Sequence, residues 1–275
     1  MSALKTRIVL TLTLLAGLAG CGGDSSAGGQ SVVAAFYPLA FAAQEIGGSG
    51  VEVRNLTPPG VEPHDLELSG KDVRTVGEAD LVLYLRGFQP SLEAAIDSTS
   101  AHAVDLLGAA VTDPHFWLDP ARYAAVADRI GKELSRRPGA EQFAAKLRAL
   151  DGEFRRGLAH CERTEIVTSH AAFSSLARYG LKQVAITGIS PEAEPTPGDL
   201  EDVVRHVRAV GATTVFFEPL VSPRLAETVA REVGATTAVL DPIEGLTDKQ
   251  VAAGEDYFSV MRENLAALRR GLACR

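Results

Sequence analysis

The strongest constraint on the fold is a repeated alternation of short apolar runs with segments of helical periodicity. The runs are rich in Val, Ile, Leu and Phe, which is typical of strands buried in a sheet. Strands alternating with helices predict an α/β fold with parallel sheets. We predict strands at residues 32–36, 51–56, 80–85, 165–168, 183–187, 213–217 and 236–240, and helices at 39–46, 90–96, 172–179, 199–210, 223–233 and 256–272.

The middle of the chain has a different pattern. Residues 120–160 are rich in Ala, Leu, Arg and Glu, and their apolar residues recur at helical spacing. Pro138 and Gly139 interrupt this pattern. We therefore predict a long linker helix over residues 120–160, kinked or broken at the proline.

The segments on either side of this linker resemble each other. Residues 51–84 and 183–217 both run through a strand, a loop containing Glu-Pro, a helix and an apolar strand. The sequence therefore predicts two similar α/β lobes, at residues 31–119 and 161–275. A ligand is expected between them, at loops that leave the carboxyl ends of strands.

The first 20 residues have the pattern of a secretory signal. Lys5 and Arg7 precede an uncharged apolar stretch that is too short to span a bilayer comfortably. The stretch ends in Leu-Ala-Gly-Cys21, which resembles the lipobox of bacterial lipoproteins, where the cysteine is acylated. A plain signal peptide with a coincidental cysteine is the alternative. Residues 21–30 are rich in Gly and Ser and are expected to form a flexible tether, and no later apolar run is long enough to cross a membrane.

Charge and cysteine content narrow the functional classes. Without Lys5 and Arg7, the mature chain has 25 basic and 35 acidic residues, a net charge of −10. Such a surface disfavours nucleic-acid partners and is compatible with the capture of cations. Cys161 and Cys274 remain after processing, and an even pair in an oxidising compartment favours a disulfide. Two free thiols or thiolate metal ligands are the alternatives.

Three of the six histidines share a structural context. His64, His115 and His170 lie on predicted loops at strand ends or element junctions, and Asp241 ends a predicted strand in the same way. Three imidazoles and one carboxylate form a closed tetrahedral set that suits zinc. The four residues are far apart in the sequence, so their spacing matches no local motif. For each histidine alone, a hydrogen-bonded structural role is the alternative.

Several neighbours are candidates for supporting these ligands. Glu62 and Asp65 flank His64 and are expected to help fix the tautomer of its ring. Trp117 follows His115 and is expected to pack between the lobes and orient the imidazole. We expect structural or solvated roles for the remaining histidines and for two acids of a Pro-rich loop: His102, His160, His206, Glu192 and Glu194.

Five segments, in order, resemble successive blocks of the zinc/manganese solute-binding proteins of ABC importers, the ZnuA-like group. They are VEPHDLEL at 61–68, DPHFWLDP at 113–120, VTSHAAFSSLARYGL at 167–181, GISPEAEPTP at 188–197 and VLDPIEGL at 239–246. The likeness covers residues 31–275. It implies two α/β lobes joined by one rigid helix, with metal held between them by His64, His115, His170 and Asp241, and an ABC permease as partner.

The resemblance also bears on the choice of metal. Manganese-selective members have a carboxylate where this chain has His170, and the softer imidazole favours zinc. Many zinc members carry a long His- and acid-rich loop between the first two ligands. In this chain the corresponding stretch, residues 101–112, is short, and His102 is its only histidine. An accessory metal-collecting role is therefore not expected for residues 101–112.

We expect a monomeric, lipid-anchored protein on the extracytoplasmic face of the membrane that captures Zn(II) without enzymatic activity. The alternatives are a manganese- or iron-binding importer component, a metal-binding adhesin and a zinc hydrolase.

Overall fold

The computed structural model describes residues 29–108 and 113–275. The expected signal peptide at 1–20, the acylated Cys21 and all but the end of the tether at 21–30 lie outside the described residues. Among the helices of the described ranges, none is both long enough and apolar enough to cross a bilayer.

The N-terminal lobe is built on a four-stranded parallel sheet. Its central strands are buried at most positions, which is typical of a parallel sheet covered by helices on its faces. The strands are β1 (Gln30–Ala34), β2 (Val51–Asn55), β3 (Leu81–Tyr84) and β4 (Ala103–Asp105), in the order β2-β1-β3-β4. The connecting helices are α1 (Tyr37–Gly47), the short 3₁₀ helix η1 (Gly48–Gly50), α2 (Gly70–Glu78) and α3 (Pro90–Asp97).

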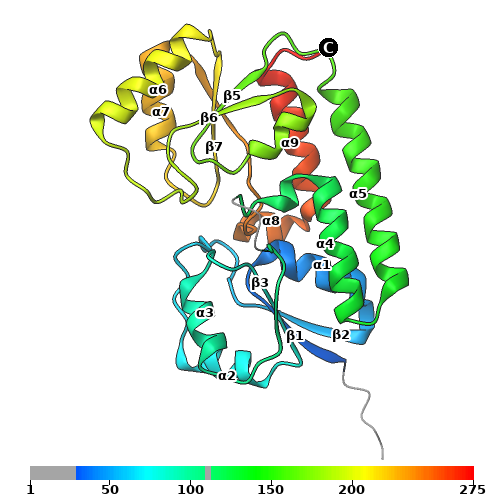
Figure 1. Cartoon of the computed structure of the whole chain (residues 1–275). Helices are drawn as coiled ribbons and strands as arrows, with labels where there is room; N and C mark the ends of the chain where they lie inside the picture. Colours follow the sequence, from blue (N-terminus) through cyan, green and yellow to red (C-terminus); the bar gives the residue numbers. More distant parts are fainter. Residues whose placement is uncertain (1–28, 109–112) are drawn as a thin grey trace, which may run out of the picture.

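The C-terminal lobe has a second sheet of the same kind. Figure 1 shows α6 and α7 on one side of this sheet and α9 on the other. The strands are β5 (Glu165–Thr168), β6 (Lys182–Ala185), β7 (Thr214–Phe217) and β8 (Thr236–Val239), in the order β6-β5-β7-β8. The helices are η3 (Ser174–Tyr179, 3₁₀), α6 (Pro197–Ala209), α7 (Arg224–Val233), α8 (Asp248–Ala253) and α9 (Tyr257–Gly271).

The two sheets share one strand order, which confirms the predicted pair of similar α/β lobes. The helix that follows the second strand of each lobe also begins with the same N-terminal capping arrangement. Ser69 and Thr196 accept hydrogen bonds from the backbone of Asp72 and Asp199, and these carboxylates accept hydrogen bonds from the N-cap backbone in return. This capping box satisfies N–H groups that the first helical turn leaves without partners. The repeat is therefore visible in local chemistry as well as in topology.

Residues 120–160 form two helices, so the long helix predicted to be kinked or broken at Pro138 is broken, just before the proline. α4 (Pro120–Glu133) and α5 (Arg137–Gly157) pack side by side. The chain turns between them at Ser135, whose φ is 53°, in the left-handed region that ends a helix. Pro138 lies in the first turn of α5, where its missing N–H removes no intrahelical bond. The proline therefore starts a helix instead of kinking one, and α5 alone runs beside both lobes (Figure 1).

A cluster of aromatic rings joins the lobes next to these helices. Phe41 of α1, Tyr123 of α4, Phe143 of α5, and Tyr257 and Phe258 of α9 contact one another with ring centroids 5.1–5.9 Å apart. They belong to one apolar core that continues from the N-terminal sheet into the C-terminal lobe, while the outer part of that lobe has a smaller core of its own. Separating the lobes would expose this packed surface to water, so the junction behaves as core rather than as a flexible hinge.

Two further segments differ from the sequence-based prediction. The expected helix at 172–179 is the 3₁₀ helix η3, ended by Gly180 at a φ of 84°. Hydrogen bonds from the backbone N–H groups of Ala171 and Phe173 to Gly188 and Gln183 hold the preceding residues in a loop. Helix α8 was not predicted, because it has no buried residue and therefore no apolar periodicity.

Cys161 and Cys274 form a disulfide. The two residues also form an isolated antiparallel bridge. The bond ties the chain after α9 to the segment before β5, which fixes the end of α9 against the start of the C-terminal sheet.

The approach of α5 to α1 generates a test of the rigid junction. A Cβ at Gly139 would lie 2.1 Å from the carbonyl oxygen of Ile46, so Gly139→Ala must displace backbone. We expect a loss of about 1–3 kcal/mol in the free energy of unfolding, measured by urea denaturation. Gly152→Ala in the same helix is the matched control, because its Cβ would meet only the flexible end of Arg156. A helix-interior alanine there should be neutral or stabilising by up to about 1 kcal/mol. Equal effects of the two substitutions would contradict the close contact.

Candidate metal centre

Four side chains from four separate loops meet between the lobes. His64 lies in the loop after β2, and His115 lies between β4 and the 3₁₀ helix η2 (Phe116–Leu118). His170 follows β5, and Glu244 lies between β8 and α8. All four loops follow the carboxyl ends of parallel strands, where open α/β sheets bind ligands. The two sheets thus each supply two of the four groups.

The four groups converge on one carboxylate oxygen. Oε1 of Glu244 lies 3.3 Å from Nε2 of His64, 2.9 Å from Nε2 of His115 and 3.4 Å from Nε2 of His170. The Nε2 atoms of His115 and His170 are 3.4 Å apart, and one ligand atom of each residue lies within 4.8 Å of the others. His115, His170 and Glu244 are buried, and the His64 side chain is 9% exposed.

These distances match a small metal coordination shell. For metal–nitrogen bonds of about 2.0–2.1 Å, neighbouring ligand atoms of a tetrahedron lie roughly 3.3–3.4 Å apart. The three distances to Oε1 of Glu244 and the distance between the Nε2 atoms of His115 and His170, at 2.9–3.4 Å, are already close to this spacing. Only modest adjustment of the side chains would therefore place one ion at their centre.

The opposite nitrogens of two rings are held by carboxylates. Nδ1 of His115 lies 2.8 Å from Oδ1 of Asp113, and Nδ1 of His170 lies 2.8 Å from the carboxylate of Glu218. A carboxylate on Nδ1 holds the proton there and leaves Nε2 as the nitrogen that can bind a metal. Neither carboxylate was predicted for this role.

Asp241, the carboxylate expected from the sequence, lies outside this group. Its Oδ1 accepts the backbone N–H of Ile243 at 2.7 Å, and its Oδ2 accepts from Nε2 of Gln250 at 2.9 Å. The side chain of Asn264, on α9, accepts the backbone N–H of Asp241 and donates to its backbone carbonyl. The structure therefore groups the three histidines with Glu244, three residues further along, and not with Asp241.

The residues predicted to support the histidines differ in what they contact. Glu62 accepts the backbone N–H of His64 at 2.9 Å, so it holds the loop instead of the ring, and Asp65 is exposed to solvent. Trp117 is fully buried with its ring centroid 5.2 Å from that of His115, and its Nε1–H donates to the carbonyl of Pro242 at 2.7 Å. The indole thus joins one histidine of the cluster to the turn that carries Glu244.

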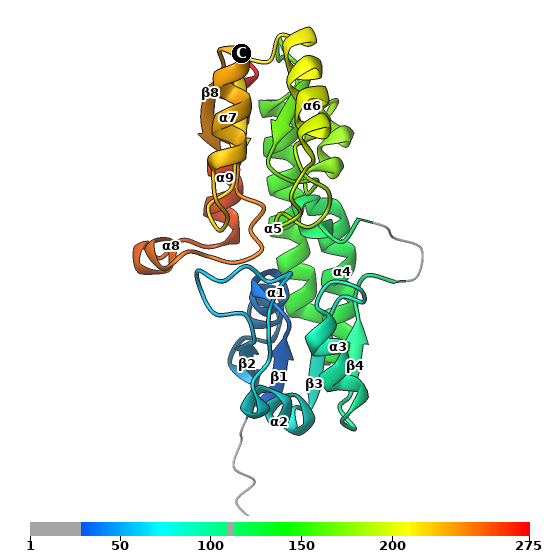
Figure 2. The same cartoon turned by 90° about the vertical axis from the view of Figure 1, so that its left-hand side faces the viewer.

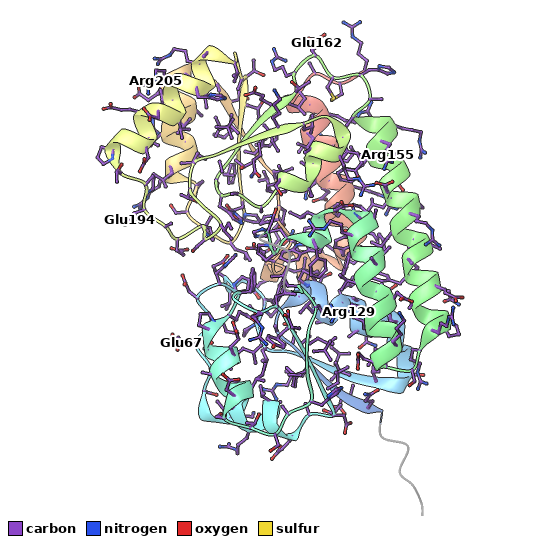
Figure 3. The ribbon with its side chains drawn as sticks, in the orientation of Figure 1. Glu67, Arg129, Arg155, Glu162, Glu194 and Arg205 are labelled. Atoms are coloured by element: carbon purple, nitrogen blue, oxygen red, sulfur yellow. A yellow bond between two sulfur atoms is a disulfide. The ribbon has the colours of Figure 1, made fainter. Side chains whose placement is uncertain are left out.

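The acids and histidines expected to be solvated lie away from the cluster. Glu194 and Glu192 are exposed on the C-terminal lobe, and Glu67, three residues after His64 and a further candidate for supporting its ring, is exposed on the N-terminal lobe (Figure 3). His102 and His206 form surface pairs with Glu133 and Glu165, and His160 is exposed.

Burial and pairing with opposite charges have opposing effects on the pKa of each group in the cluster. Burial alone would lower the pKa of His115 and His170, but hydrogen bonds to Asp113, Glu218 and Glu244 outweigh it. The pKa of His115 is raised and that of His170 rises to about 10. Burial alone would raise the pKa of Glu244, but the three imidazoles hold it well below its usual value. Without metal, the site is therefore an ion pair between imidazolium and carboxylate groups.

The carboxylates around the cluster behave differently. Burial, with a further contribution from the Glu244 charge, raises the pKa of Glu62 to about 8. Burial also raises the pKa of Glu218, against the opposing effect of His170. For Asp113, burial is outweighed by hydrogen bonds from His115 and Ser174, and its pKa is lowered.

Glu218, Asp113 and Glu244 were not predicted to belong to the site, although the sequence around the first two indicates their roles. Glu218 directly follows β7, so the rule that selected His170, a polar residue just after a strand, also selects Glu218. Asp113 lies two residues before His115, where an Asp side chain often binds the backbone of a following residue. Glu244 follows the end of β8 by five residues, and nothing in its spacing separates it from Asp241.

The chain is similar in sequence to proteins of zinc uptake and zinc binding. The family model described as ZnuA, zinc-uptake complex component A, periplasmic, matches residues 32–271. The chain is 32% identical over 290 residues to the zinc-binding lipoprotein AdcA of Streptococcus pneumoniae serotype 4, covering 92% of this chain. It is 30% identical over 298 residues to the high-affinity zinc uptake system protein ZnuA of Bacillus subtilis, covering 93% of each.

A solved structure has a similar fold. The Zn(II)-bound ZnuA-like domain of AdcA from Streptococcus pneumoniae matches with a TM-score of 0.76 and 34% identity, over 89% of this chain and 99% of that one. The chain spans 58% of the length of the curated AdcA relative.

The raised imidazole pKa values predict a steep pH dependence of metal binding. His170, whose pKa rises to about 10, holds a proton at neutral pH in the metal-free protein, and the pKa of His115 is raised as well. A metal binds only the neutral ring, so binding must release protons. Apparent Zn(II) affinity should therefore rise with pH across the range from 6 to 8, by at least roughly tenfold per pH unit. The check is chelator competition at several pH values, with calorimetry in buffers of different ionisation enthalpy to count the protons. An affinity that does not change over this range would contradict the assigned charges.

Proposed function

Because the chain belongs to the ZnuA family of zinc-uptake components, we propose that it is the solute-binding component of an ABC importer that captures Zn(II) and delivers it to the membrane permease. The observation that carries the proposal is the convergence of three imidazole Nε2 atoms and Glu244 Oε1 in a buried site between the lobes. A protein that must hold an ion and release it unchanged needs such a site and no reactive group.

We infer that the ligands are His64, His115, His170 and Glu244. Three imidazole nitrogens and one carboxylate oxygen favour zinc over manganese and over alkaline-earth ions, which prefer mainly oxygen ligands. The carboxylates on Nδ1 of His115 and His170 strengthen this preference, since they make Nε2 more basic.

The same ligand set supports binding without catalysis. Catalytic zinc sites keep three protein ligands and an open position for water, whereas four protein ligands close a tetrahedral shell. With Glu244 in the fourth position, no coordination site is left for a nucleophilic water. A zinc hydrolase is therefore not proposed.

We also propose that the protein is exported and anchored to the membrane. The family description places its members in the periplasm, and the AdcA relative is named a lipoprotein. The Leu-Ala-Gly-Cys21 motif supports acylation of Cys21 after removal of residues 1–20. We propose that residues 21–30 tether a monomer to the extracytoplasmic face of the membrane, where it can reach the permease.

Substitution of the ligands tests the proposed set directly. Glu244→Ala and His170→Ala each remove one of four ligands, and each should weaken Zn(II) binding by more than about 100-fold, beyond the usual effect of losing an indirect partner. His206→Ala, at a surface histidine paired with Glu165, is the control and should bind like the wild type. Competition with chelators measures the affinities, and wild-type protein should prefer Zn(II) to Mn(II). Near-native affinity in Glu244→Ala would remove Glu244 from the set.

Uptake in cells tests the importer role and the anchor. Cells that lack the protein should lose growth and zinc accumulation at low zinc, and the wild-type gene should restore both, whereas Glu244→Ala should not. Cys21→Ser should move the protein from the membrane fraction to the soluble fraction. Normal zinc accumulation in the deletion strain would argue against an importer component, and retention of Cys21→Ser on the membrane would argue against the lipid anchor.

A further inference from the structure

The turn that presents Glu244 has an unfavourable backbone conformation. Ile243, the residue before it, has a φ of 56° and is fully buried. β-branched residues rarely adopt the left-handed region, which costs roughly 1–2 kcal/mol for a residue with a side chain. Such a conformation persists only where neighbouring contacts hold it. The direction of the Glu244 side chain therefore depends on whatever holds this turn.

The contacts on the turn come from three directions. The Asp241 carboxylate accepts the N–H of Ile243 itself, at 2.7 Å. Trp117 donates to the carbonyl of Pro242, and Asn264 of α9 binds the backbone N–H and C=O of Asp241 at 2.8 and 2.6 Å. Trp117 and Asn264 lie on the packed core, whereas the Asp241 side chain depends on a partner of its own.

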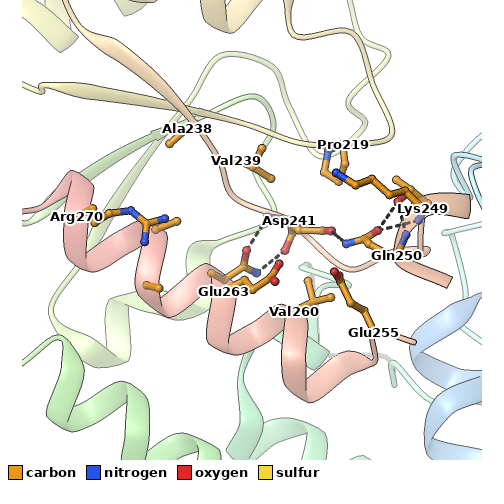
Figure 4. A pocket seen from close by; sticks show the side chains of 14 residues that line it. Pro219, Ala238, Val239, Asp241, Lys249, Gln250, Glu255, Val260, Glu263 and Arg270 are labelled. Atoms are coloured by element: carbon orange, nitrogen blue, oxygen red, sulfur yellow. Dashed lines mark hydrogen bonds between the residues drawn. The ribbon is translucent and has the colours of Figure 1, made fainter. Parts of the chain in front are cut away.

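That partner is Gln250, on the short helix α8. Its Nε2 donates to Oδ2 of Asp241 at 2.9 Å, and its Oε1 accepts the backbone N–H and the hydroxyl of Thr247 at 2.8 and 2.9 Å. Gln250 is thus at once the third residue of the α8 capping box and the partner of the Asp241 carboxylate. Figure 4 shows this chain of bonds from α8 through Gln250 to Asp241 and on to α9.

Helix α8 itself is weakly held. It contains no buried residue, and it projects from the side of the molecule in Figure 2. A cavity of about 640 Å³, lined by Val239 of β8, Lys249 of α8 and Glu263 of α9 among others, separates it from the C-terminal lobe. With so little apolar contact, α8 is a segment that can open locally at small cost. Its link to the buried turn is the polar bond from Gln250.

We propose that Asp241 and Gln250 form a positioning pair that transmits the placement of α8 to Glu244. With α8 in place, Gln250 fixes the Asp241 carboxylate, which holds the strained Ile243 and aims Glu244 at the three imidazoles. When α8 moves away, the turn relaxes and Glu244 leaves the ion. The proposal rests on Glu244 being a zinc ligand, as inferred above, and it makes α8 the element through which the release rate of the ion is set.

Exchanging the hydrogen-bond donor and acceptor between Gln250 and Asp241 tests the positioning pair. Gln250→Glu keeps the capping box, because a glutamate at this position still accepts from Thr247, but it faces Asp241 with a second carboxylate. Asp241→Asn keeps the acceptor for Ile243 and turns an amide donor toward the donor of Gln250. Each single substitution should speed the dissociation of Zn(II), measured by chelator chase, by roughly 10–100-fold. The double substitution restores one donor and one acceptor and should return the rate to within about threefold of wild type.

A control separates positioning from general destabilisation. Asp199→Asn alters the capping box of α6 in the same lobe, away from Glu244, and should cost stability in urea without changing the dissociation rate. If wild-type protein binds Zn(II) tightly and Gln250→Glu releases it at the wild-type rate, the positioning pair is wrong and the proposed function stands. Failure of the double substitution to restore the rate also overturns the pair. Wild-type protein that does not bind Zn(II) overturns the proposed function together with the pair.

Discussion

The site depends on one buried carboxylate oxygen that three imidazoles share. A buried charge is tolerated only when it is paired and hydrogen-bonded, and Oε1 of Glu244 meets this condition through His64, His115 and His170. No single lobe could supply these partners, because two of the four residues come from each sheet. Much of the remaining architecture, including the duplicated sheets and the packed junction between them, serves to bring four distant loops to one point.

Pairing of the charges explains why the cluster can be assembled without an ion. The raised pKa values of His115 and His170 favour the charged imidazolium forms, which can pair with the Glu244 carboxylate when no divalent cation is present. The aromatic core around Tyr123 and Tyr257 keeps the lobes at a fixed spacing. Little binding free energy is then needed for reorganisation, and an ion displaces protons from groups that are already in position.

The fold was largely predictable because it follows from periodicity that is local in the sequence. Apolar runs and capping residues determine the strands and helices, and the similar order of elements on either side of residues 120–160 predicts two lobes. A break near Pro138 was predicted, but its position at Ser135 was not, because no glycine marks it and a non-glycine residue adopts the left-handed conformation. Helix α8 gave no signal for a related reason: it faces water and a cavity, so burial imposes no pattern on it.

The sequence indicated which side chains lie together where they follow strands closely, but not where the backbone turns afterwards. His64, His115 and His170 come together as their placement at strand ends indicates. Asp241 satisfies the same rule, but its carboxylate is used within the chain, on the N–H of Ile243. The positive φ of Ile243 then directs Glu244 to the imidazoles. A backbone conformation that a β-branched residue seldom adopts cannot be inferred from sequence pattern alone.

The position of Trp117 has a practical consequence. It is the only tryptophan in the chain, and its ring lies against His115 while its N–H binds the turn next to Glu244. The indole chromophore of this protein thus lies beside the cluster of His64, His115, His170 and Glu244. Tryptophan emission therefore comes from a ring next to two of the proposed ligands, so binding and release of an ion at this cluster can be followed optically in the unmodified molecule.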